Sequence, residues 1–210
     1  MIRVEQLEVG PMSNYAYLLC DAAAGACAVV DPGWDAPKIL AAARAQGCSV
    51  AAVLLTHHHF DHSNEVPSLV RAAPAPVYVH RADAGPVRPK APDLREVSDG
   101  DRMKVGRCEV EFLHTPGHTR GSQCLRAGRN LLTGDTLFLG ACGRVDLEDS
   151  DPEQMTKSLR RLAGLPGTLT VWPGHAYGPA PSGPLSVEIA TNPYMLAAIV
   201  EGKAGSDLEI

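Results

Sequence analysis

The sequence predicts an α+β protein, a single domain of 210 residues in which two packed sheets carry helices on their outer faces. Three observations favour this fold class. Short apolar or alternating runs bounded by Gly, Pro and Asp recur along the chain, as strands require. Alanine-rich or amphipathic stretches with helical spacing separate these runs. In each half the strands precede a helix, and no internal repeat or low-complexity linker interrupts the chain.

The first half is expected to open with an antiparallel meander of three strands, at residues 4–9, 15–20 and 26–31. An alanine-rich helix over 35–45 follows, and its apolar residues recur at helical spacing. The apolar run at 50–55 then predicts a buried strand. Together the last three elements form a strand-helix-strand unit.

The chain then leaves this unit through a second helix. Ser63 is expected to cap a helix over 64–73, because a serine hydroxyl accepts a hydrogen bond from the first turn. A short strand at 77–79 follows. Residues 81–100 contain several prolines among mixed charges, so we interpret them as a helical turn and a surface connection rather than as a border of a functional site.

The second half is predicted to contain further strands and two helical segments. The residues at 107–113 alternate between apolar and charged side chains, as in a half-buried strand. More strands are expected at 122–126, 130–133 and 169–172, a helix over 151–162, and a helical tail from about 185 with a break at Asn192-Pro193. We expect one domain over 1–210, without a separate C-terminal domain.

Charge and composition limit the function classes. The formal net charge is −5, and no block of like charges suggests a nucleic-acid partner or a membrane surface. The opening segment lacks the apolar stretch of a signal peptide, and no run approaches the roughly 20 apolar residues of a membrane span. We therefore expect a cytoplasmic protein. The six cysteines are scattered and are expected to be reduced.

The stretch from Thr56 to His62 places four histidines and an aspartate in seven residues, directly after the strand at 50–55. Imidazole and carboxylate groups are the side chains that coordinate zinc, iron or manganese. His57 and His59 are two residues apart and project to the same side of an extended backbone. Asp61 and His62 can face a neighbouring point. The stretch therefore predicts two adjacent metal ions.

Three further candidate ligands lie at the ends of later strands. His118, Asp135 and His175 each follow an apolar run and lie next to a glycine or threonine turn. With the histidine stretch they complete two sets. His57, His59 and His118 can hold one ion, Asp61, His62 and His175 can hold the second, and Asp135 can bridge both. Asp31, also at a strand end, is a candidate to support the histidine stretch or to cap a turn.

The ordered motifs HxHxDH, GHT, GDT and GH at these positions resemble the metallo-β-lactamase superfamily over residues 1 to about 195. The resemblance implies an αββα sandwich with the metal ions at one edge, between the sheets. Within the superfamily, GDTLF, the ACGR at 141–144, the DPEQM at 151–155 and GHAYG are similar to the hydroxyacylglutathione hydrolase (glyoxalase II) branch.

That branch implies hydrolysis of S-2-hydroxyacylglutathione thioesters by a hydroxide bridging two divalent ions, most often zinc, with iron or manganese as alternatives. Asp61 would then be catalytic as well as a ligand, orienting the hydroxide. Arg144 and Tyr177 match residues that contact glutathione, so a glutathione conjugate is the expected small-molecule partner. A guanidinium and a phenol suit a peptide carboxylate and amide.

Two enzymatic alternatives remain open, besides a metal-binding protein without catalysis. Asp146 stands where glyoxalase II has a second tyrosine, and the resulting GRVD is similar to the GRTD of persulfide dioxygenases. Those enzymes bind a single Fe(II) through residues matching His57, His118 and Asp135, and they act on glutathione persulfide. A lactonase or another small-ester hydrolase is the other alternative. The resemblance also implies that full-length glyoxalase II has a helical C-terminal domain, for which we expect no counterpart within these 210 residues.

Overall fold

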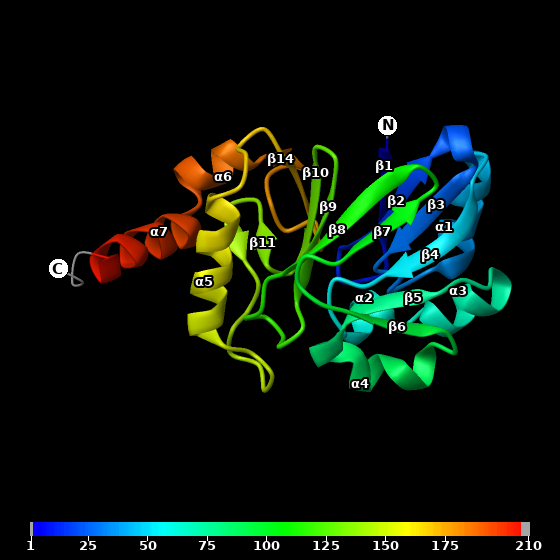
Figure 1. Cartoon of the computed structure of the whole chain (residues 1–210), viewed down its shortest axis with the longest axis horizontal. Helices are drawn as coiled ribbons and strands as arrows, with labels where there is room; N and C mark the ends of the chain where they lie inside the picture. The colour runs from blue at the N-terminus through cyan, green and yellow to red at the C-terminus, as the bar shows by residue number, and fades with distance from the viewer. Residues whose placement is uncertain (1, 207–210) are drawn as a thin grey trace.

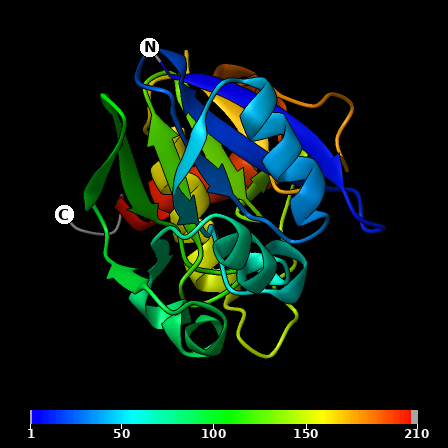
Figure 2. The ribbon, with the colours of Figure 1, turned by 90° about the vertical axis from the view of Figure 1, so that its right-hand side faces the viewer.

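The computed structural model describes residues 2–206 and consists of two six-stranded sheets packed face to face. Helices cover the outer face of each sheet, so the order of layers is helix, sheet, sheet, helix. Figure 1 shows α5, α6 and α7 on one side of the molecule and α1 and α3 on the other. In Figure 2, turned by 90°, α1 and α3 lie in front of the sheets and α5 and α7 lie behind them. The predicted α+β layered fold is confirmed.

The first sheet has the order β1-β2-β3-β4-β5-β6. Its strands are β1 Arg3–Val9, β2 Asn14–Asp21, β3 Ala26–Val30, β4 Ser49–Leu54, β5 Val77–His80 and β6 Leu94–Val97. The first three pair antiparallel, as the meander predicts, and β3 to β6 pair parallel. Parallel pairing brings the carboxyl ends of β3, β4 and β5 to one edge, where the histidine stretch begins.

The second sheet has the order β14-β13-β10-β9-β8-β7. Its strands are β7 Arg102–Val105, β8 Cys108–His114, β9 Gln123–Ala127, β10 Asn130–Gly134, β13 Thr170–Pro173 and β14 Gly183–Pro184. β10 and β13 pair parallel, so their carboxyl ends lie side by side. A separate two-stranded ribbon, β11 Leu137–Phe138 and β12 Ala141–Cys142, follows β10.

Three apolar clusters hold the layers together by removing apolar area from water. The main helices are α1 Ala36–Ala45, α2 Phe60–Ser63, α3 Val66–Ala72, α4 Ala84–Val87, α5 Pro152–Ala163, α6 Leu185–Thr191 and α7 Pro193–Ser206. One cluster, with Tyr17, Leu54 and Phe112, lies between the sheets. A second packs α1 and α3 on the first sheet. The third packs α5 to α7 on the second sheet, around Leu131 and Leu159.

The structure corrects two details of the sequence analysis. Ser63 does not cap the second helix: it is the last residue of α2, and its hydroxyl donates to the carbonyl oxygens of His58 and His59 at 3.0 and 2.9 Å. Residues 81–100 are not only a connection, because they end in strand β6, an edge strand whose polar sequence concealed it. The break at Asn192 between α6 and α7 is confirmed.

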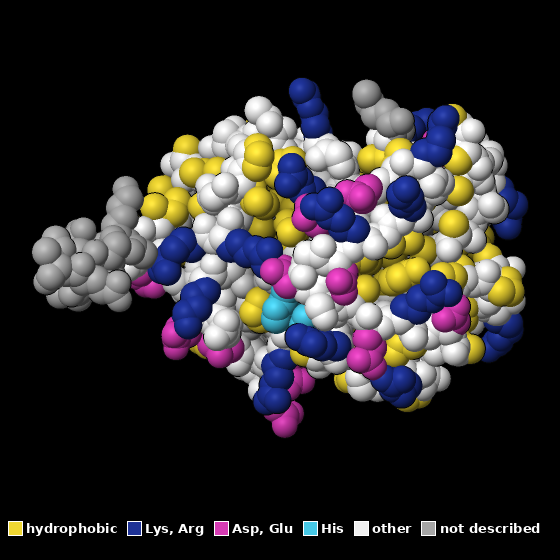
Figure 3. Space-filling model, viewed as in Figure 1, with side chains coloured by type: hydrophobic (Ala, Val, Ile, Leu, Met, Phe, Trp, Pro, Cys, Tyr) yellow, Lys and Arg dark blue, Asp and Glu magenta, His cyan; other side chains and the backbone are white. Residues whose placement is uncertain are grey.

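The described surface is mixed in charge. Acidic and basic side chains are interspersed on the face viewed in Figure 3, in keeping with the small net charge. Among the helices within residues 2–206, none combines the length and the apolar character needed to cross a membrane. The described cysteines are free, as expected.

Candidate metal centre

The seven predicted ligands converge where the strands of both sheets end. β4 leads into the histidine stretch, β10 ends directly before Asp135, and β13 ends just before His175. Backbone hydrogen bonds join these ends: Gly174 N donates to Gly134 O, and Tyr15 N of the first sheet donates to Gly174 O, both at 2.8 Å. A Cβ on Gly174 would lie 2.2 Å from Asp135 Oδ1, so only glycine allows this approach.

The first group comprises His57, His59 and His118, whose ligand atoms all lie within 4.8 Å of one another. His118 Nε2 lies 3.0 Å from His59 Nδ1. Two of these residues come from the loop after β4 in the first sheet and the third from the loop between β8 and β9 in the second. The packing of the sheets therefore assembles the group.

The second group comprises Asp61, His62 and His175, also with ligand atoms within 4.8 Å. His62 Nε2 lies 3.2 Å from His175 Nε2 and 3.6 Å from Asp61 Oδ2. Asp135 lies between the two groups. Its Oδ1 is 3.4 Å from His62 Nε2, and its Oδ2 is 3.5 Å from His118 Nε2. This placement gives one carboxylate access to both groups.

In four of the histidines the ring nitrogen that points away from the other ligands, Nδ1, lies within hydrogen-bond distance of a neighbouring group. The Nδ1 atoms of His118 and His175 lie 2.9 Å from the carbonyl oxygens of Arg144 and Met12. Because a carbonyl can only accept, each Nδ1 carries a hydrogen, and the Nε2 of the neutral ring turns a lone pair inward. His62 Nδ1 lies 3.1 Å from Asp31 Oδ2, and His57 Nδ1 lies 3.1 Å from Thr56 Oγ1.

These inward lone pairs fit a metal ion. The Nε2 atoms of His62 and His175 face each other at 3.2 Å, an arrangement that requires a proton or a cation between them. His57 Nε2 and Asp135 Oδ1 are buried without a hydrogen-bond partner, which is costly unless another ligand satisfies them. Histidine nitrogens and carboxylate oxygens are suitable donors for divalent zinc, iron or manganese.

The two groups differ in their protonation. Burial, reinforced by neighbouring imidazoles, lowers the pKa of His57 well below its usual value and that of His59 to about 4. Burial also opposes the charged form of His175, yet hydrogen bonds to Asp135 and Asp61 outweigh it and raise its pKa to about 10. The metal-free second group therefore holds a proton where an ion can bind.

Three polar residues support the ligands, and the sequence analysis named only one of them, Asp31. It offered two roles for Asp31, support of the histidine stretch or capping of a turn. Asp31 accepts from Thr56 N at 2.7 Å and contacts His62, which confirms the supporting role. Asn14 was missed: its Nδ2 donates to Asp61 Oδ2 at 3.0 Å. Asp83 was missed as well and contacts His58. Neither residue belongs to a motif, and only the folded chain brings them close.

A cavity of about 470 Å³ opens onto the two groups. Arg144 and Tyr177, the predicted substrate contacts, both line it, together with apolar side chains such as Phe138. Arg144 forms a bidentate pair with Asp146, at 2.9 and 3.0 Å. The Tyr177 ring stacks on His175 with ring centroids 4.5 Å apart. Tyr177 lies at the mouth of the cavity, since its side chain is largely exposed.

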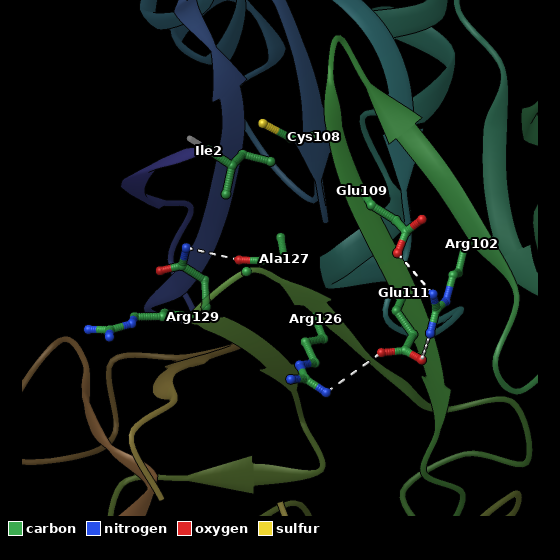
Figure 4. Close-up of a pocket in the computed structure, with 10 residues that line it drawn as sticks. Ile2, Arg102, Cys108, Glu109, Glu111, Arg126, Ala127 and Arg129 are labelled. Carbon is green, nitrogen blue, oxygen red and sulfur yellow. Dashed lines mark hydrogen bonds and ion pairs between the residues drawn. The ribbon is translucent and has the colours of Figure 1, made fainter. Parts of the chain in front are cut away.

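A larger cavity, of about 800 Å³, lies at the other end of β8 and is separate from the ligand groups. Figure 4 shows Ile2 and Cys108 on one part of its wall and ion pairs on another. Arg102 pairs there with Glu109 and Glu111 at 3.1 and 3.0 Å. Arg126 also lies 3.8 Å from Glu111, and the residues that line this cavity include none of the seven candidate ligands.

Comparison with known proteins agrees with the motifs. The chain is 42% identical over 168 residues to a hydroxyacylglutathione hydrolase of Alkalilimnicola ehrlichii, which covers 78% of this chain and 62% of that protein. It thus spans less than two thirds of that relative's length. It is 32% identical to a probable polyketide biosynthesis zinc-dependent hydrolase of Bacillus subtilis, over 80% of this chain and 76% of that one.

The solved structures and family models extend this agreement to the whole fold. The crystal structure of ETHE1 from Myxococcus xanthus superposes with a TM-score of 0.85 at 27% identity, covering 98% of this chain and 92% of that one. The family model described as the metallo-beta-lactamase superfamily matches residues 9–175, which include all seven candidate ligands. The chain therefore belongs to the metallo-β-lactamase superfamily.

Proposed function

We propose that the protein is a metal-dependent hydrolase that cleaves thioesters of the S-2-hydroxyacylglutathione type. The observation that carries the proposal is the position of Asp135. Its two oxygens lie 3.4 and 3.5 Å from His62 and His118, one in each of two complete three-residue groups. A shared carboxylate between two such groups is the arrangement that two-metal hydrolytic sites use.

In this proposal His57, His59 and His118 would hold one divalent ion, and Asp61, His62 and His175 would hold the other. Asp135 would offer one carboxylate oxygen to each group. When bound, the ions would lower the pKa of a coordinated water and polarise the carbonyl group of the substrate. Zinc is the metal we expect, and the name of the zinc-dependent relative supports this choice. Iron and manganese suit the same donors.

Asp61 is the residue that we expect to orient the attacking water. Burial opposes ionisation of this carboxyl group, but the hydrogen bond from His175 and the nearby His62 outweigh it, so the pKa of Asp61 is lowered. It stays a carboxylate at neutral pH, with one oxygen held by Asn14. Its other oxygen can accept a hydrogen bond from water. Attack of the water oxygen on the carbonyl carbon forms a C–O bond and breaks the C–S bond. The proton that the water gives up goes to the departing thiolate, so the products are a carboxylic acid and a thiol.

A glutathione thioester is the substrate class that we propose for the cavity. The hydroxyacylglutathione hydrolase relative supports it by name. Arg144 can bind a substrate carboxylate if its bond to Asp146 opens, because both side chains are about 70% exposed and the pair is weakly held. Tyr177 can donate to a peptide carbonyl from the cavity mouth. The apolar wall around Phe138 suits the acyl group.

A second candidate is an iron-dependent dioxygenase acting on glutathione persulfide. The observation that favours it is Asp146, which places a carboxylate beside Arg144 where glyoxalase II enzymes carry a tyrosine. Such an enzyme would need one iron, held by His57, His118 and Asp135, and would leave the second group without an ion.

Metal content and two assays separate these candidates. The protein should be purified without added zinc, analysed for metals, and assayed for S-lactoylglutathione hydrolysis and for oxygen uptake with glutathione persulfide. The hydrolase proposal predicts about two ions per chain and thioester cleavage. About one iron per chain with oxygen uptake would replace it with the dioxygenase. Bound metal without turnover of either substrate would contradict both, and a lactone or small-ester substrate would then be tested.

A further inference from the structure

Asp83 is a buried carboxylate outside every motif of the metal centre. It ends the short helical turn Arg81–Asp83 that follows β5, in the segment interpreted from the sequence as a surface connection. Only 1% of its surface is exposed. A buried carboxylate is costly unless several donors surround it, so its partners reveal what it stabilises.

Three hydrogen-bond donors from two loops converge on this carboxylate. His58 N donates to Oδ2 at 3.0 Å, and His58 Nδ1 lies 2.9 Å from the same oxygen without forming a hydrogen bond. Thr119 Oγ1 donates to Oδ2 at 2.7 Å, and Gly121 N donates to Oδ1 at 2.6 Å. Burial alone would raise the pKa of Asp83, but His58 and Thr119 outweigh it and lower the pKa. The group is therefore an anion held by hydrogen bonds.

These two loops are the ones that carry the first ligand group. His58 stands between His57 and His59, and Thr119 directly follows His118. One carboxylate thus ties the loop after β4, in the first sheet, to the loop between β8 and β9, in the second. None of these three donors belongs to Asp61, His62 or His175.

Gly121 shows that the fit around Asp83 is close. A Cβ at this position would lie 2.4 Å from Asp83 Oδ1, well inside van der Waals contact. The glycine therefore lets its backbone N–H approach the carboxylate, which no larger residue could do without moving the loop. This is an observation independent of the hydrogen bonds to His58 and Thr119.

Asp31 provides a comparison within the same site. It accepts from Thr56 N at 2.7 Å and from Thr56 Oγ1 at 2.6 Å, and it contacts His62 Nδ1 at 3.1 Å. Thr56 in turn contacts His57. Asp31 therefore supports one histidine of each group, whereas Asp83 contacts only the loops of the first.

We propose that Asp83 is a positioning residue that holds His57, His59 and His118 in the geometry that binds the first ion, and that it does not act on the second. It touches neither substrate nor ion. Partners of metal ligands typically change metal affinity by roughly 10–100-fold when they are lost. This inference rests on the proposed two-ion centre but not on the proposed substrate.

The test is a zinc titration of the metal-free protein against a chromophoric chelator, without substrate. In Asp83→Asn the amide nitrogen replaces either Oδ1, which accepts from Gly121 N, or Oδ2, which accepts from His58 N and Thr119 Oγ1, so at least one hydrogen bond is lost. We expect the dissociation constant of one ion to rise about 10–100-fold and that of the other to change less than about threefold. Asp31→Asn should weaken both ions.

A double variant identifies which ion responds. In a His118→Ala background the first ion is already lost, so adding Asp83→Asn should leave the affinity of the remaining ion unchanged. Thr119→Val removes one hydrogen bond to Asp83, together with the contact between Thr119 Oγ1 and Ser122 Oγ, and keeps the charge of Asp83. It should therefore weaken the same ion to a smaller extent, and it serves as the milder variant if Asp83→Asn does not fold.

Two outcomes would overturn the proposal. One is an equal loss of both ions in Asp83→Asn or Thr119→Val, which would make Asp83 a general structural residue. The other is an unchanged titration in both variants. Thermal unfolding of the metal-free variants shows whether each is folded before it is titrated. A chain that binds two ions but does not cleave the thioester would leave the inference intact and contradict only the proposed substrate.

Discussion

The two ligand groups face one cavity but differ in the protonation of their histidines. His57 and His59 of the first group have lowered pKa values, that of His59 being about 4, so both are neutral at pH 7. In the second group the carboxylates raise the pKa of His175 to about 10. His57 and His59 can therefore bind a cation at neutral pH without losing a proton, whereas His175 must first release one.

The origin of this difference lies in the placement of carboxylates. His175 Nε2 lies 3.4 Å from both Asp61 Oδ2 and Asp135 Oδ2. His57 and His59 are instead surrounded by other imidazoles, with ring centroids 4.8 Å apart and His118 beside them. The three ligand residues of each group, known from the sequence, therefore indicate that a divalent metal ion can bind there. The neighbouring charges decide how strongly protons compete with that ion.

The largest expected effect comes from the one residue shared by both groups. Asp135→Ala removes the carboxylate between them, and we expect it to abolish the binding of both ions and all turnover. Metal analysis after dialysis, together with thioester hydrolysis, measures this. Asp93→Ala removes an exposed carboxylate that pairs with Arg95, away from the ligands, and serves as the control. Full activity in Asp135→Ala would contradict the two-ion centre.

Single ligand changes should separate the two groups. His118→Ala is expected to lose the first ion and His175→Ala the second, so each reduces the stoichiometry from about two ions to about one. Each removes a donor whose outer nitrogen is held by a backbone carbonyl, so the two changes are matched. Metal analysis of both variants would show the effect. If either variant lost both ions, the groups would bind cooperatively and the comparison would fail.

The pH dependence of binding should differ between the ions. His175 must lose its proton to bind, so between pH 6 and 9, below its pKa of about 10, the affinity of the second ion should rise with pH by about tenfold per unit. The first ion should vary less, because His57 and His59 are already neutral there. Zinc titrations of His118→Ala and His175→Ala at several pH values isolate each ion. Equal slopes would contradict the difference in protonation.

The ligands could be predicted from the sequence because their signal is local. His57 to His62 are close in the chain, and His118, Asp135 and His175 each follow an apolar strand. The packed layers were predictable for the same reason, since each buried strand carries its own apolar pattern. Short or polar edge strands such as β6, β7 and β14 lack that pattern and were missed.

Two of the supporting residues, Asp83 and Asn14, could not be predicted, because what defines them is distance in space. Asp83 lies in a proline-rich segment that looks like a solvated connection, and its function depends on a loop 36 positions away, at Thr119. Asn14 is 47 positions from Asp61. Neither spacing nor composition marks such a residue. A buried aspartate or asparagine becomes informative only when its hydrogen-bond partners are known.

The smallest expected effect concerns Asn14, which supports only the second group. Its Nδ2 donates to Asp61 Oδ2 at 3.0 Å and to Asp61 O at 3.1 Å, and Trp34 Nε1 donates to its Oδ1 at 3.0 Å. Asn14→Ala frees the Asp61 carboxylate to rotate, so we expect about tenfold weaker binding of the second ion and an unchanged first ion. The same chelator titration measures both.

Trp34→Phe is the matched control for Asn14→Ala. It removes the indole N–H that holds Asn14 but retains an aromatic ring against Phe60, whose ring centroid lies 6.1 Å away. Asn14 would then keep its bonds to Asp61 with less restraint, so the second ion should weaken by less than in Asn14→Ala. If Asn14→Ala weakened the binding of the first ion as much as that of the second, Asn14 would not be specific to the second group. The difference in protonation alone would then distinguish the two groups.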